Sequence, residues 1–102
     1  MKLKPIYRIP EANIQAELYH KLKLEGIESI LEYKSDGCKL DLIVVKGRDI
    51  KCIIEVKSYT KNRLPNYHTK QIEKYKKFNL PIKICGSMSD IPNTLKFIKE
   101  YL

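Results

Sequence analysis

The segment LDLIVV at 40–45, the connector KGRD at 46–49 and the segment IKCIIEVK at 50–57 decide how this chain folds. Both apolar runs are rich in β-branched residues and the connector contains a glycine, which predicts a hairpin of two buried strands. Charged residues interrupt this apolar surface at three positions: Asp41, Glu55 and Lys57. Side chains alternate faces along a strand, so Glu55 and Lys57 project from the same side, and pairing through the turn can bring Asp41 beside them.

Two carboxylates and an ammonium group inside an apolar hairpin are costly to bury without a compensating partner. A divalent cation held by Asp41 and Glu55, with Lys57 beside it, would provide that compensation. The same residues allow a buried salt bridge instead, in which Lys57 pairs with one acid and fixes the register. Such pairs seldom add net stability, so the pattern favours the cation site.

Before the hairpin, the sequence predicts a helix and then a strand. Residues 11–24 carry an apolar residue at every fourth position, which predicts one buried helical face, and Gly26 is placed to end the helix. Glu17 lies at the margin of that face, where its carboxylate could point across the sheet or simply be solvated. Residues 27–33 are short and apolar and lead into the turn signal Asp36-Gly37, which predicts a first strand, while a helix over 28–33 also fits the pattern.

After the hairpin, the sequence predicts a loop, a helix, a strand and a final helix. Residues 58–66 are polar and basic, residues 67–78 have helical periodicity, and residues 80–86 form an apolar run between a proline and a glycine. A last helix is expected from about Pro92 to the terminus. The element order predicts an α/β fold with one mixed central sheet and a single domain over 1–102.

Composition limits the classes of function. At 102 residues the chain has room for one modest core, and 43% hydrophobic with 31% charged residues is typical of a folded domain. A net charge of +8 favours a polyanionic partner, of which nucleic acid is the commonest. No run approaches the roughly 20 apolar residues of a membrane span, so we expect a cytoplasmic protein without a membrane partner. The three cysteines have no metal-binding or paired spacing, which fits a reducing compartment.

Asp41, followed across the hairpin by Glu55-Val56-Lys57, resembles the D…(D/E)-x-K signature of the PD-(D/E)XK nuclease superfamily. The predicted order is similar to its α-β-β-β-α-β core, so the resemblance implies a restriction-endonuclease-like core with an added C-terminal helix. Gln71-x-x-x-Tyr75 is similar to the RecB-type motif, and the compact chain looks most like VRR-NUC domains and archaeal-type Holliday-junction resolvases. Two features depart from these patterns: Leu40 replaces the superfamily's proline, and the Gly-Pro-Asp run usual in VRR-NUC domains is absent.

The resemblance implies a Mg²⁺-dependent DNA endonuclease in which Mn²⁺ can replace Mg²⁺. The implied metal ligands are three carboxylates and one main-chain carbonyl, those of Asp41, Glu55, Glu17 and Val56. Lys57 would position or deprotonate the attacking water or stabilise the transition state. The implied catalytic set is Glu17, Asp41, Glu55, Lys57 and Gln71. Side chains expected to contact nucleic acid are Lys61, Arg63, Lys70, Lys74, Tyr75 and Lys77.

The expected substrate is DNA that is duplex, branched or a junction, cut by a homodimer, because one compact site cuts one strand. No organic cofactor is expected. A sequence-specific restriction or homing-type nuclease is an alternative, although base readout usually needs added loops or subunits. Another alternative is a non-catalytic nuclease-fold module that binds nucleic acid without cutting it.

Overall fold

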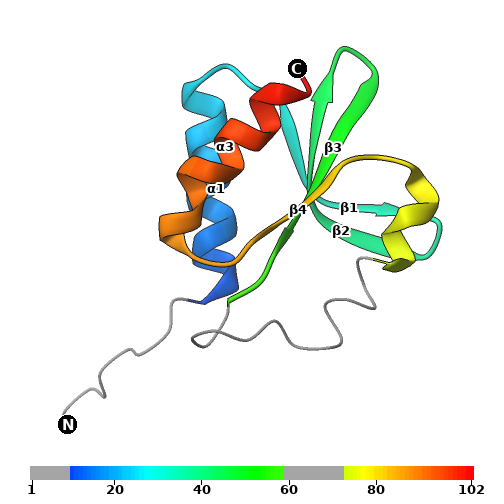
Figure 1. The fold of residues 1–102 in the computed structure, drawn as a ribbon, viewed down its shortest axis with the longest axis horizontal. Coiled ribbons are helices and arrows are strands. Elements are labelled where there is room, and N and C mark those ends of the chain that lie inside the picture. The colour runs from blue at the N-terminus through cyan, green and yellow to red at the C-terminus, as the bar shows by residue number, and fades with distance from the viewer. Residues whose placement is uncertain (1–9, 59–72) are drawn as a thin grey trace, which may run out of the picture.

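The computed structural model describes residues 10–58 and 73–102 and has a mixed α/β fold (Figure 1). The elements in chain order are α1 (Glu11–Leu24), β1 (Ser29–Ser35), β2 (Cys38–Lys46), β3 (Asp49–Val56), η1 (Lys76–Phe78), β4 (Ile82–Cys85), η2 (Met88–Asp90) and α3 (Ile91–Glu100). The expected helix over 67–78 begins outside the described residues, and its described end at 73–75 is helical and continues into η1. The predicted α/β class, mixed sheet and C-terminal helix are confirmed.

The four strands form one sheet in the order β1-β2-β3-β4. β1, β2 and β3 are antiparallel neighbours, and β4 runs parallel to β3. The segment over 28–33, for which the sequence allowed either a helix or a strand, therefore belongs to strand β1 from Ser29 onward. The turn from β1 to β2 has positive φ at Asp36 (50°) and Gly37 (73°). Two successive positive φ values are the requirement of a tight hairpin turn that matches the twist of its strands, which is why an Asp-Gly pair predicts it.

Each face of the sheet is covered by different segments (Figure 1). Helices α1 and α3 lie together against one face, and the apolar stripe of α1 packs there with Ile54, Cys85 and Ile98. On the opposite face a second cluster contains Leu40, Ile53 and Tyr75. The hairpin of β2 and β3 thus lies between two apolar layers. None of the described helices has the length and apolar character needed to cross a bilayer.

Candidate active site

Asp41 lies where β2 loses regular pairing with both of its neighbours. The register of β1 and β2 omits the position at which Glu32 would oppose Asp41, and Glu32 has a left-handed φ of 52°. On the other side, the pairing of β2 with β3 begins only at Leu42, opposite Ile54. Local breaks of this kind change the direction of a side chain within a sheet. Here the break allows the Asp41 side chain to turn toward β3.

Two hydrogen bonds hold Asp41 at the point where its pairing with both neighbouring strands is interrupted. The Val56 N–H donates to Asp41 Oδ2 at 2.8 Å, and Gln15 Nε2 on α1 donates to the Asp41 carbonyl at 2.7 Å. The backbone and the carboxylate of Asp41 are therefore each held by a separate element. Sequence reasoning missed this role of Gln15; its place on the stripe next to the buried face of α1 was the available signal.

Glu55 and Lys57 complete the cluster, as the hairpin pattern predicted. The Glu55 side chain is 2% exposed, and its Oε1 lies 3.5 Å from the Nζ of Lys57, whose side chain is 13% exposed. The other carboxylate oxygen, Oε2, is buried and has no hydrogen-bond partner among the described residues. Glu55 thus keeps one unsatisfied oxygen beside Asp41.

Burial and mutual repulsion disfavour the ionised form of this acid pair. Burial, followed by the charge of the nearby Asp41, raises the pKa of Glu55 to about 7, against the opposing effect of the Lys57 ammonium. Burial also raises the pKa of Asp41, against the opposing effects of the Val56 N–H and Lys57. Lys57 alone does not neutralise the two carboxylates, which leaves the site suited to an additional cation.

The donor set fits a hard divalent cation. Mg²⁺ is commonly bound by one or two carboxylates, with water and substrate phosphate oxygens in the other positions. The unsatisfied Glu55 Oε2 and the Asp41 carboxylate supply two such ligands. No group of three or more His, Cys, Asp or Glu side chains arranged to hold a metal occurs within 10–58 and 73–102. The Asp41 and Glu55 carboxylates are the ligands that these residues would offer a metal, and the Val56 carbonyl stays a predicted third ligand.

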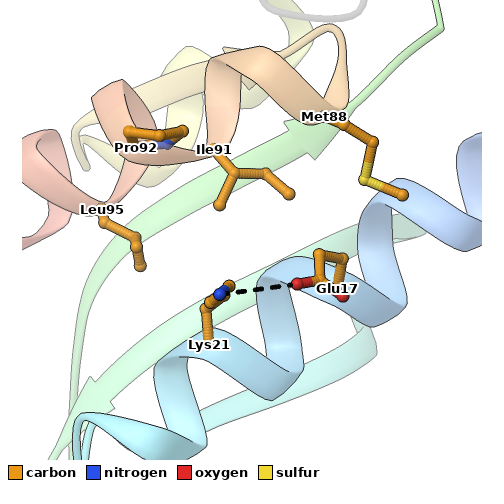
Figure 2. Close-up of a pocket in the computed structure, with 6 residues that line it drawn as sticks. All are labelled: Glu17, Lys21, Met88, Ile91, Pro92 and Leu95. Carbon is orange, nitrogen blue, oxygen red and sulfur yellow. Dashed lines mark ion pairs between the residues drawn. The ribbon is translucent and has the colours of Figure 1, made fainter.

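The structure does not bring Glu17, a predicted ligand, into this cluster. Its carboxylate lies 3.8 Å from Lys21 Nζ one turn along α1, and its side chain is partly exposed. Figure 2 shows both side chains facing α3 across a hollow of about 450 Å³ that is also lined by Met88, Ile91, Pro92 and Leu95. The helix was predicted correctly, but Glu17 is on the side of it that faces α3.

Glu11, in the first turn of α1, is the helix acid that reaches the site. It lines a hollow of about 260 Å³ together with Gln15, Asp41 and Val56. Its negative charge adds to the rise in the pKa of Asp41, and its Oε1 accepts a hydrogen bond of 3.3 Å from the Ser58 N–H. Six residues separate Glu11 from Glu17, which places them on different sides of a helix with 3.6 residues per turn.

Tyr75, which was expected to contact nucleic acid, is buried in the structure. It is 3% exposed, and its hydroxyl donates to the Lys39 carbonyl at 3.3 Å. Burial, followed by the charges of Glu55 and Asp41, raises its pKa to about 12. The ring therefore belongs to the core behind the site.

Of the basic side chains predicted to contact nucleic acid, the structure describes Lys74 and Lys77, and both are exposed. Lys77 Nζ donates to the Asp36 carbonyl in the β1–β2 turn at 3.0 Å. The remaining predicted contacts, and one predicted catalytic residue, lie outside the described residues: Lys61, Arg63, Lys70 and Gln71. Their roles stay predictions.

A solved structure described as "VRR_NUC domain" superposes on this chain with a TM-score of 0.61, covering 90% of this chain and 97% of the other at 20% sequence identity. The chain has the VRR_NUC fold. The likeness confirms the predicted restriction-endonuclease-like architecture as a fold. No protein-family model matches the sequence, and a search of the curated proteins found no match. At this identity the VRR_NUC likeness establishes the fold, and the activity has to be argued from the site.

Proposed function

We propose that this chain is a metal-dependent nuclease that hydrolyses phosphodiester bonds in DNA. The observation that carries the proposal is the buried Glu55 beside the half-buried Asp41: Glu55 retains an unsatisfied oxygen and has a lysine 3.5 Å away. A pair of acids that burial holds at raised pKa values is more typical of a functional site than of a structural one. The VRR_NUC fold supports the same reading.

Each residue would have a distinct part in the reaction. Asp41 and Glu55 would hold Mg²⁺ or Mn²⁺, and a bound metal lowers the pKa of a coordinated water and offsets negative charge on a phosphate. The Lys57 ammonium would orient the attacking water or bind charge that develops on the phosphate. Gln15 would keep Asp41 in place through its backbone carbonyl. Glu11 would accept a hydrogen bond from water on the helix side of the hollow.

The proposed substrate is DNA with a structural feature such as a branch or junction, cut by a homodimer. The net charge of +8 supports a polyanionic substrate. Two strands require two sites, which a symmetric dimer would supply. The second candidate, a module that binds nucleic acid without cutting it, shares the same charge but leaves the buried Glu55 beside Asp41 unexplained.

The proposal is tested by incubating the purified protein with Mg²⁺ or Mn²⁺ and a panel of plasmid, linear duplex, flap, junction and single-stranded DNA, with RNA alongside. We expect cleavage that EDTA stops and that Lys57→Ala slows by about 10²-fold or more, the lower end for a group that assists proton transfer. Undiminished cleavage by Lys57→Ala would contradict the site assignment. Salt-sensitive binding with no cleavage in either metal would favour the binding module.

Replacing Gln15 by leucine should lower kcat by about tenfold and leave KM nearly unchanged, because one hydrogen bond of about 1.4 kcal/mol holds the Asp41 backbone. Asn13→Leu is the matched control, since Asn13 is exposed on the same helix. Both constants are measured in steady-state cleavage assays on samples shown to be folded. Equal kcat values for the Gln15 variant and the control would exclude a positioning role.

A further inference from the structure

We infer that the end of the β1–β2 hairpin binds a backbone phosphate of the nucleic acid through Lys34 and Lys39. The inference rests on the proposed function, because β2 also carries Asp41. It adds a phosphate subsite at residues that lie outside the predicted contact set, on the β1 side of the acid pair.

The first observation is an unfavourable pairing of charges. Lys34 on β1 and Lys39 on β2 are direct cross-strand partners in the register, and like charges placed opposite one another destabilise a sheet. Both lysines line one hollow of about 230 Å³ with Gly37 and Cys38. An anion bound in that hollow would replace the repulsion between the two ammonium groups by attraction to both.

The second observation is that Lys39 lies between a basic hollow and an acidic one. Lys39 also lines the hollow that holds Asp41, Glu11 and Glu32. Its Nζ lies 3.6 Å from Glu32 Oε2, and both side chains are more than half exposed. The acidic hollow alone repels a phosphate chain, so the cations that hold the flanking phosphates have to lie beside it. The hairpin lysines fulfil that condition.

The third observation is that the hairpin end is held in place before any ligand arrives. The Tyr75 hydroxyl donates to the Lys39 carbonyl at 3.3 Å, and Lys77 Nζ donates to the Asp36 carbonyl at 3.0 Å. Both bonds tie the hairpin to residues in or next to η1, which lies near this hairpin in Figure 1. A surface that is already ordered loses little conformational freedom on binding.

The test measures DNA affinity in EDTA over a range of salt concentrations for the wild type, Lys34→Gln, Lys39→Gln and the control Lys96→Gln. Lys96 is exposed on α3, which lies beside α1 and away from the end of the β1–β2 hairpin (Figure 1). Each hairpin variant should reduce the slope of log affinity against log salt by about 0.9 for duplex and about 0.7 for single-stranded DNA. The control should keep the wild-type slope. Without DNA, Lys34→Gln should also raise Tm, because it removes a like-charge partner.

The outcomes separate this inference from the proposed activity. Wild-type slopes in both hairpin variants, or an equal loss in the control, overturn the phosphate subsite. Reduced slopes in the hairpin variants alone support it. If these appear while Mg²⁺ and Mn²⁺ give no cleavage, the subsite stands and the proposed nuclease activity fails. A wild type that shows no salt-dependent DNA binding overturns both.

Discussion

Glu55→Gln is expected to abolish cleavage while making the metal-free protein more stable. An amide is a poor ligand for Mg²⁺, so losing this carboxylate should remove about 4 kcal/mol of transition-state stabilisation, which corresponds to a rate lower by about 10³-fold. The same change removes a negative charge that is buried beside Asp41, so unfolding in EDTA should require a higher temperature. The two effects have opposite signs, which a simple loss of folding cannot produce.

The measurement combines a cleavage assay with thermal unfolding in EDTA and in Mg²⁺. Mg²⁺ should raise the Tm of the wild type, because it binds only the folded site, and should leave the Tm of Glu55→Gln unchanged. Glu100→Gln is the control, since it removes an acid that is exposed at the end of α3. Cleavage by Glu55→Gln within tenfold of the wild-type rate would show that Glu55 is not a ligand.

The metal-free protein should lose stability as the pH rises from about 4.5 to about 7. The pKa of Glu55 is raised from its ordinary 4.5 to about 7 on folding, chiefly by burial. Between these values the unfolded chain has released the proton while the folded protein keeps it, so the folded state binds more protons and unfolding becomes easier. A shift of this size corresponds to a loss on the order of 3 kcal/mol across that interval.

This pH dependence is measured by denaturant unfolding in EDTA at several pH values. Subtracting the curve of Glu55→Gln gives the contribution of Glu55 together with its effect on the pKa of the neighbouring Asp41, because the variant retains every other titrating group. The difference between the two should be small below pH 4.5, should grow to pH 7 and should then level off. A difference that is constant across the interval would show that Glu55 titrates normally in the folded protein.

The sequence predicted the hairpin and its three charged residues because both depend on local rules. Alternation along a strand places Glu55 and Lys57 on one side, and the structure brings them together at 3.5 Å. These local rules could not decide which glutamate of α1 lies at the site. The periodicity of α1 identifies its buried face, but which flank meets β2 and which meets α3 depends on how the helix crosses the sheet. Glu11 and Glu17 flank the same apolar stripe, and only the tertiary packing assigns Glu11 to the site.

Two other features could not be read from the sequence because they arise from irregular backbone. The gap in the pairing of β1 with β2 at Asp41 coincides with a left-handed φ at Glu32, a conformation that a glutamate in the sequence does not predict. The Gln15 amide donates to the Asp41 carbonyl at that gap. Tyr75 was expected to contact nucleic acid because it lies near the predicted site, while in the structure its ring fills the core beneath the hairpin.

The backbone of Glu32 also affects how copies of this chain can associate. β1 is an outer strand of the sheet, and Ile30 and Leu31 are exposed on it. An exposed edge strand can pair with a strand of another chain, which is a common origin of fibrous aggregates. The left-handed residue puts the free amide and carbonyl groups of β1 out of line midway along the strand. An added strand would find only two short stretches to pair with, so β1 is a poor template for strand addition.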